Sequence, residues 1–134
     1  MRPATGRHRG TTAESSVIAG MSHLRTPNSR MSWLAAVFLN VGLVPVGVHT
    51  ICIGGLANAQ IHHREVFKAA IVANAHSMIL GHNHPSGNVN PSEDDVRITT
   101  SLVEVSKLLG IPILDHVIVA PGPRFASMCD RGLL

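Results

Sequence analysis

The sequence contains no long apolar run, and this absence sets the first limit on what the chain can be. A membrane-spanning helix needs about 18 or more consecutive apolar residues, and no such stretch occurs. The first 30 residues include arginines but no apolar segment of the kind that a secretory signal peptide carries. We therefore expect neither a membrane span nor a signal peptide, and we predict a cytoplasmic protein.

Cysteine is also scarce. The two cysteines, Cys52 and Cys129, are far apart and form no C-x-x-C pair. We expect them to be small buried side chains in a reducing compartment rather than a disulfide or metal ligands. The same scarcity argues against a zinc nucleoside deaminase, because these enzymes combine an H-x-E motif with P-C-x-x-C. His63 and Glu65 supply an H-x-E, but the cysteine half is absent.

Acidic residues are nearly missing from the N-terminal end. Residues 1–30 hold five arginines and one glutamate, a balance of +4, whereas residues 31–134 hold six basic and seven acidic groups, a balance of −1. Scattered arginines among Ser, Thr, Gly and Pro are typical of a solvated tail, and none of them form a cluster dense enough to follow a phosphate backbone. We therefore predict a disordered basic tail over residues 1–30. The chain of 134 residues is 45% hydrophobic, which suits a single globular domain, predicted over residues 31–134.

Apolar runs and breaker residues alternate along this domain and predict a mixed α/β fold. The first two apolar runs lie close together and indicate a β-hairpin. A hairpin at the start argues against a wholly parallel sheet, and two helices among about five strands indicate a mixed one. The predicted strands are Trp33–Leu39, Leu43–Ile53, Ser77–Gly81, Ile113–Ala120 and Phe125–Met128, and the predicted helices are Arg64–His76 and residues 92–109, the latter ended by Gly110.

The segment from His82 to Asp95 carries the strongest chemical pattern. Side chains alternate along a strand, so His82 and His84 share one face at the end of the short run SMILG. A cluster of Pro, Gly and Asn then ends the strand. Ser92 and Asp95 form an S-x-x-D helix start, with Ser92 as N-cap. Because Asp95 precedes the apolar stripe that begins at Ile98 by three residues, we expect its carboxylate to point inward.

An inward carboxylate needs compensation, and two imidazoles with a divalent ion would provide it. Two neutral histidines and one carboxylate leave the fourth position of a tetrahedral zinc open for water, as in catalytic sites. His82, His84 and Asp95 are therefore the predicted Zn²⁺ ligands. In the alternative interpretation, this segment is a polar loop in which Asp95 only completes a capping box.

The wider spacing resembles a known family. His82-x-His84, seven residues, Ser92, two residues and Asp95 are similar to the H-x-H-x7-S-x2-D signature of JAMM/MPN-type (JAB-like) zinc metallohydrolases. HNHPSG followed by PSxxD resembles the RadC branch in particular, and the similarity covers roughly residues 33–134. The resemblance implies a cytidine-deaminase-like layered α/β fold, with the zinc where strand and helix ends meet.

The same resemblance implies a function. It indicates a zinc-dependent metallohydrolase of the peptidase or isopeptidase type, in which Ser92 donates to the oxyanion of the substrate. A peptide or protein is the implied substrate. Nucleic acid enters only through the traditional association of the family name with DNA repair. Ser92 could equally be a helix cap alone, or serve both roles.

The general base departs from the family pattern. JAMM enzymes supply a glutamate from an upstream strand, and the comparable position here is near Ser32, where no glutamate occurs. Glu65 is a weak candidate for the base, and a helix N-terminal carboxylate is the simpler interpretation of it. The alternative function is therefore a non-catalytic metal-binding relative that acts as an interaction or DNA-repair accessory module. The four glutamates of the chain are Glu14, Glu65, Glu93 and Glu104.

Asp115 and His116 are the last pair of interest. They resemble the DHIIV strand of the family, and we expect them either to support the metal ligands by hydrogen bonding or to form a polar strand start. The sequence leaves both interpretations open.

Overall fold

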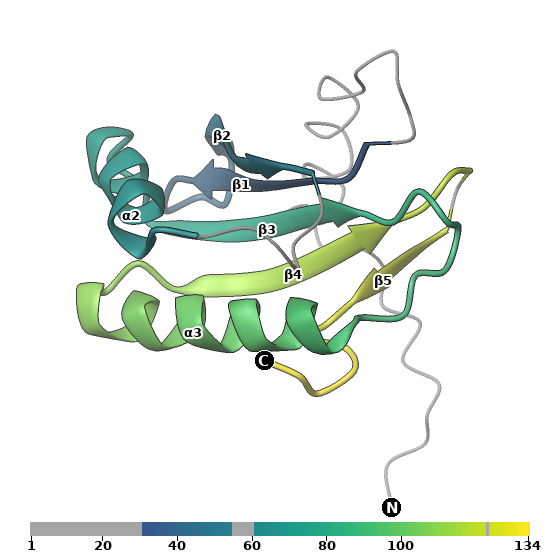
Figure 1. Ribbon diagram of the computed structural model, residues 1–134. Helices are drawn as coiled ribbons and strands as arrows, with labels where there is room; N and C mark the ends of the chain where they lie inside the picture. The colour runs from purple at the N-terminus through teal and green to yellow at the C-terminus, as the bar shows by residue number, and fades with distance from the viewer. Residues whose placement is uncertain (1–30, 55–60, 123) are drawn as a thin grey trace, which may run out of the picture.

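The described residues form a five-stranded mixed sheet with two helices (Figure 1). The computed structural model describes residues 31–54, 61–122 and 124–134. The predicted tail over residues 1–30 lies outside the described residues, so the tail and the domain boundary stay predictions. The elements are β1 (Trp33–Leu39), β2 (Pro45–Ile53), α2 (His63–Val72), β3 (Ser77–Asn83), α3 (Glu93–Leu109), β4 (Ile113–Val119) and β5 (Phe125–Ser127).

The strand order β2-β1-β3-β4-β5 places the first strand in the interior of the sheet. β1 pairs antiparallel with both β2 and β3, β3 pairs parallel with β4, and β4 pairs antiparallel with β5. Every residue of β1 is buried, as a continuous apolar run predicts for a strand covered on both faces. The predicted mixed α/β sheet and its hairpin start are confirmed.

Several predicted boundaries were wrong by a few residues, each for a local reason. β2 begins at Pro45 and not at Leu43, because Leu43 has a φ of 60° in the turn after β1. α2 ends at Val72 and not at His76, since Asn74, with a φ of 53°, turns the chain out of the helix. β3 continues to Asn83, two residues beyond the predicted end, because its pairing with β4 runs on to that residue. The last two strands each end one residue early.

The two helices cover one face of the sheet. Leu34, Phe38 and Leu80 pack in one cluster with Phe67 of α2 and Leu102 of α3. The opposite face carries a separate cluster that includes Trp33, Val37 and Ile79. Because alternate residues of a strand point to opposite faces, even-numbered positions of β1 and β3 face the helices.

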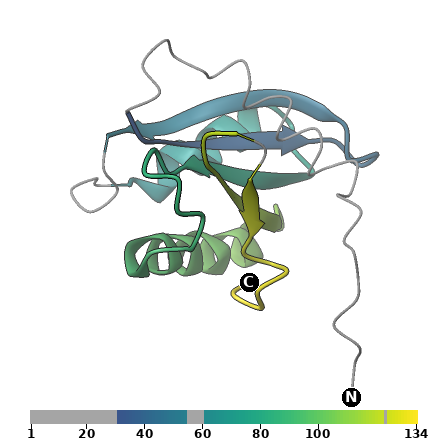
Figure 2. The same cartoon turned by 90° about the vertical axis from the view of Figure 1, so that its right-hand side faces the viewer.

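The loop between β3 and α3 lies beside the turn between β4 and β5, at one end of the sheet (Figures 1 and 2). Arg131, near the C-terminus, donates a hydrogen bond of 2.8 Å from Nη1 to Oδ1 of Asn90 in this loop. The loop is therefore anchored to the last part of the chain as well as to its own flanking elements.

None of the helices in the described part of the chain is long and apolar enough to cross a membrane.

The two cysteines differ in burial. Cys52 is half-buried, and burial raises the pKa of its thiol despite a backbone hydrogen bond to Leu34 that lowers it. Cys129 is exposed, so the expectation of burial was wrong for this residue.

Candidate metal centre

The end of β3 brings two histidines to the helix-covered face. His82 pairs with Leu34 on one side and with Ile118 on the other, and only 4% of its surface is exposed. His84 follows the strand, and its backbone N–H donates to the carbonyl of Val119 over 2.8 Å. The two rings meet edge to face with their centroids 4.7 Å apart. The expectation that both side chains share one face agrees with this contact.

The first turn of α3 supplies a carboxylate to the same place. Ser92 is the N-cap, and its Oγ accepts from the backbone N–H of Asp95 at 3.1 Å. In return, the backbone N–H of Ser92 donates to Oδ2 of Asp95 at 2.8 Å, which completes a capping box. Asp95 is 0% exposed, so the predicted inward orientation is confirmed. Forming a capping box and facing the histidines are thus compatible, and Asp95 does both.

The three side chains converge. Nε2 of His84 lies 2.9 Å from Oδ2 of Asp95, and Nδ1 of His82 lies 3.1 Å from Oδ1 of the same carboxylate. One possible ligand atom from each residue lies within 4.8 Å of the others. In the described residues this is the one group of three or more His, Cys, Asp or Glu side chains close enough to hold a metal ion.

The position of a proton on His84 shows why this arrangement calls for a cation. Nδ1 of His84 lies 2.7 Å from the carbonyl oxygen of Asn88. A carbonyl can only accept, so Nδ1 carries the hydrogen and a neutral ring has a bare lone pair at Nε2. That lone pair faces a carboxylate oxygen of Asp95. Two acceptors in contact need a positive charge between them, which a second proton on His84 or a bound metal ion can provide.

His82 and Asp95 give a second indication of a bound cation. Nδ1 of His82 and Oδ1 of Asp95 are buried, and neither makes a correctly aligned hydrogen bond although they are 3.1 Å apart. Buried polar atoms without partners are costly. An ion coordinated by both atoms would remove this cost. Two imidazole nitrogens and one carboxylate oxygen are a donor set that suits zinc, so the residues present fit that metal.

Asp95 is held in its ionised form. Burial by itself raises the pKa of this carboxyl group. The close contact with His82, the backbone N–H of Ser92 and the charges of His82 and His84 together outweigh burial, so the pKa lies well below its ordinary value of 3.8. Asp95 is therefore ready to bind a cation without first losing a proton.

The proposed catalytic residues lie in different places. Ser92 is exposed at the N-cap, directly beside the carboxylate of Asp95. Glu65 is exposed in the first turn of α2 and is not part of the metal-binding group. Ser32, near which the family resemblance implies a glutamate, donates from Oγ to the carbonyl of Gly54 at 2.8 Å. The structure therefore brings Ser92, but not Glu65, into the cluster of predicted ligands.

Asp115 and His116 have separate roles, which the sequence could not distinguish. The carboxylate of Asp115 accepts hydrogen bonds from Ser127 Oγ and from the backbone N–H groups of His116 and Cys129, so it ties β4 to the end of the chain. His116 instead bonds to Thr99 of α3, and its ring centroid lies 6.1 Å from that of His82. Only His116 adjoins the metal ligands.

Asn83, the residue between the two histidines, was not singled out by the sequence pattern. Its Oδ1 accepts from the backbone N–H of Trp33 at 2.6 Å, and its Nδ2 donates to the carbonyl of Met31 at 3.0 Å. This side chain fixes the start of β1 against the end of β3. The one available signal was its place inside an H-x-H motif at a strand end, where the side chain must face away from the ligands.

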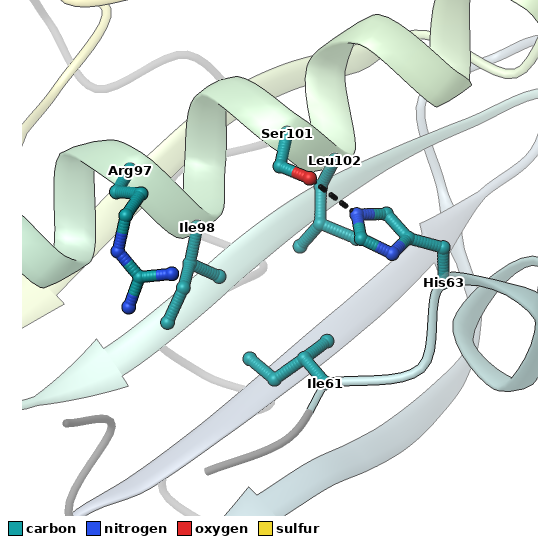
Figure 3. A pocket seen from close by; sticks show the side chains of 6 residues that line it. All are labelled: Ile61, His63, Arg97, Ile98, Ser101 and Leu102. Carbon is teal, nitrogen blue, oxygen red and sulfur yellow. Dashed lines mark hydrogen bonds between the residues drawn. The ribbon is translucent and has the colours of Figure 1, made fainter. Parts of the chain in front are cut away.

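A pocket lies along α3, close to Asp95 in sequence (Figure 3). Apolar and polar side chains line it together, and Nε2 of His63 is hydrogen-bonded to Oγ of Ser101 on its wall. Arg97 also pairs with Asp94 at 3.1 Å on the exposed side of the helix. The lining residues are Ile61, His63, Arg97, Ile98, Ser101 and Leu102.

Comparison with known proteins places this geometry in a family. Residues 12–133 match the family model of the RadC-like JAB domain. A UPF0758 protein of Caldanaerobacter subterraneus subsp. tengcongensis is 50% identical over 96 residues, which cover 72% of this chain and 41% of that protein. A UPF0758 protein of Rubrobacter xylanophilus is 40% identical over 117 residues, which cover 87% of this chain and 51% of that protein. The chain therefore spans about half or less of the length of these relatives. The resemblance inferred from the motif is confirmed, and the chain belongs to the RadC-like JAB domain family.

Proposed function

We propose that this domain binds Zn²⁺ through His82, His84 and Asp95 and acts as a metallohydrolase on a peptide or isopeptide bond. The observation that carries the proposal is the convergence of three side chains whose lone pairs face one another in a nearly buried site. A cytidine-deaminase-like layering of the fold is part of the same proposal and is supported by the mixed sheet with helices on one face.

The chemistry follows from three ligands and an open position. A bound zinc supplies a Lewis acid and lowers the pKa of a coordinated water from near 16 to about 7. Ser92 is placed to assist, because its Oγ accepts from the N–H of Asp95 and its own hydroxyl hydrogen is left for a substrate oxygen. A hydrogen bond to the developing oxyanion is worth about 10²- to 10³-fold in rate.

The pocket along α3 supports a peptide as substrate. Arg97 and Ile98 lie within one helical turn after Asp95 on the same helix, so a chain held at the metal could extend over them. The pocket walls combine apolar side chains with a hydrogen-bonded His63–Ser101 pair, which suits a side chain of mixed character.

A second function is favoured by the absence of a base. In the described part of the chain, Asp95 is the one carboxylate of the metal-binding group, and Glu14 lies outside that part. A domain that holds a metal without a proton acceptor beside it would serve as an interaction module. Its link to DNA repair rests on the family name alone.

Metal analysis of the purified protein tests the proposal. We expect about one zinc per chain in the parent and little in His82→Ala or Asp95→Ala, because each variant removes a ligand. Zinc should also raise the unfolding midpoint of the parent alone, since ions that bind only the folded state stabilise it. His76→Ala is a matched control, because His76 is an exposed histidine outside the cluster.

Peptidase and isopeptidase assays then separate the two functions. Turnover that disappears in His82→Ala supports the hydrolase, whereas stoichiometric zinc without turnover supports the interaction module. Equal zinc content in the parent, His82→Ala and Asp95→Ala would contradict the metal centre itself.

A further inference from the structure

A third histidine lies against the proposed metal centre without being one of its ligands. His116 is opposite Leu80 in the parallel pairing of β4 with β3, so it shares the helix-covered face with His82. Its exposed fraction is 0%. The rings of His116 and His82 are 6.1 Å apart between centroids and tilted by 47°. Together with His84 they form a row of imidazoles that runs from the partly exposed loop into the core.

The hydrogen bonds of Thr99 fix the proton on His116. Oγ1 of Thr99 donates its single hydrogen to the carbonyl of Asp95 at 2.6 Å, and Nδ1 of His116 lies 2.5 Å from the same oxygen. Because that hydroxyl hydrogen is already used, Nδ1 of His116 must be the donor to Thr99. Nε2 of His116 is then a bare lone pair.

This lone pair has no partner. Nε2 of His116 is buried and accepts no hydrogen bond from any residue that the structure describes. A buried acceptor of this kind needs a hydrogen-bond donor, which a residue of the metal-bound site could supply.

His82 becomes such a donor when it binds a metal ion. The nitrogen of His82 that faces Asp95 is Nδ1. A nitrogen that coordinates a metal must be deprotonated, so the hydrogen of a metal-bound His82 is on Nε2. Metal-bound histidines almost always donate this second N–H to an acceptor, which fixes the orientation of the ring.

We propose that His116 is a positioning residue for the metal centre and that its Nε2 accepts the Nε2–H of metal-bound His82. This inference rests on the proposed function, because His82 has the required tautomer only when it is a ligand. An in-line N–H···N bond between two imidazoles corresponds to a centroid separation of roughly 5 Å. The proposed bond therefore requires the two rings to approach each other by about 1 Å when the ion binds.

Two substitutions at the same position separate this role from a purely structural one. In His116→Gln the side-chain amide reaches the place of Nε2 and can offer an acceptor to His82, but the donor to Thr99 is lost. In His116→Asn the amide reaches the place of Nδ1, so a donor to Thr99 is kept and the acceptor for His82 is lost. We expect zinc affinity, measured by competition with a chromophoric chelator, to fall about 10- to 100-fold in His116→Asn and clearly less in His116→Gln.

Zinc affinity that is lower in His116→Gln than in His116→Asn, or equal in the two variants, would overturn the inference while leaving the three-ligand site intact. A parent that binds no zinc would overturn the proposed function and this inference together. Circular dichroism identifies any variant that fails to fold, and His76→Asn controls for the loss of a histidine elsewhere.

In the zinc-loaded parent, nitrogen-15 spectra of labelled histidine should show coupling between Nε2 of His82 and Nε2 of His116. A bare Nε2 on His82, or a protonated Nε2 on His116, would contradict the proposed bond independently of any variant.

Discussion

At the scale of single residues, the positions of the protons on the imidazole rings define the site. The contact of His84 with the carbonyl of Asn88 leaves Nε2 of His84 as a lone pair that faces Asp95. The contact of His116 with Thr99 leaves another lone pair in the core. Each of these tautomers follows from an oxygen that has no hydrogen to offer the ring: a carbonyl for His84, and a hydroxyl whose hydrogen is already donated elsewhere for His116. Backbone and hydroxyl groups thus decide which ring nitrogens are available to a metal or to a neighbouring ring.

His116 should make the metal-free protein sensitive to acid. Burial, reinforced by the charge of His82, lowers the pKa of this ring from 6.5 to about 3 in the folded protein. Between these values the unfolded chain binds a proton that the folded protein excludes, so stability is lost as the pH falls below about 6.5. From pH 7 to pH 5 the contribution of His116 is on the order of 2 kcal/mol.

Urea unfolding in the presence of a chelator measures this loss. We expect the parent to lose more unfolding free energy between pH 7 and pH 5 than His116→Gln does, because the variant has no titrating group at this position. The difference between the two proteins isolates His116 from the other histidines, which both proteins keep. If the unfolding free energies of the parent and of His116→Gln change in parallel with pH, the pKa of His116 is the same in the folded and unfolded states, and the prediction is wrong.

At the scale of elements, the start of α3 and the loop before it build the ligand set together. Gly87 has a φ of 89°, a conformation that side chains rarely adopt, and its N–H donates to the carbonyl of His84 at 3.1 Å. This turn brings the carbonyl of Asn88 back onto the ring of His84. The loop thus orients one ligand, and the capping box at Ser92 orients another.

Ser92 should combine a structural and a catalytic effect that two substitutions can separate. Ser92→Ala removes the acceptor for the backbone N–H of Asp95, and loss of an N-cap costs about 1 kcal/mol. Ser92→Thr keeps a cap and a hydroxyl. We expect both variants to bind zinc, and Ser92→Ala to lose about 10²- to 10³-fold in kcat if its hydroxyl stabilises the oxyanion.

Chemical denaturation and steady-state kinetics on the same preparations test this prediction. A variant Ser92→Ala that loses stability but keeps its kcat would assign Ser92 to helix capping alone. We expect Ser92→Ala to lose both stability and kcat, and Ser92→Thr to keep most of both.

At the scale of the whole molecule, strand pairing decides what surrounds the proposed metal site. β1 lies between β2 and β3, and Leu34 pairs with His82. Asn83 holds both neighbours of Ser32, because it bonds to the carbonyl of Met31 and the N–H of Trp33. Continuing the pairing of Leu34 with His82 by two residues would bring residue 32 opposite His84. We therefore expect a longer side chain at this position, near which the family resemblance implies a glutamate, to reach toward the proposed ligands.

Ser32→Glu should therefore supply the missing base. A carboxylate at this position can accept a proton from water at the metal and pass it to the leaving amine, and general-base catalysis typically contributes 10²- to 10⁴-fold. We expect Ser32→Glu to hydrolyse peptide substrates at least about tenfold faster than the parent. The isosteric Ser32→Gln cannot act as a base and should stay at the level of the parent, and all three proteins should bind zinc equally.

Equal rates for Ser32→Glu and Ser32→Gln would show that a carboxylate at residue 32 does not reach the reacting water. The zinc content of each variant, measured on the same samples, excludes loss of the metal as the reason.

The sequence by itself determined the features that depend on short stretches of chain. The alternation of side chains in a strand, the turn residues after it and the capping signal at Ser92 together predicted which face His82 and His84 share and where Asp95 points. All of these lie within residues 82–95, where local geometry dictates the outcome. The order of strands and helices was likewise readable from the alternation of apolar runs and breakers.

Only the tertiary structure decided which distant residues join the site. His116 adjoins His82 because β3 and β4 pair in one parallel register, and Leu34 lies opposite His82 because β1 pairs with β3. A shift of either pairing by one residue would turn these side chains to the opposite face. Register depends on packing across the whole sheet rather than on neighbouring residues in the chain. For the same reason the exposed position of Glu65, on a helix outside the cluster, could not be read from its H-x-E motif.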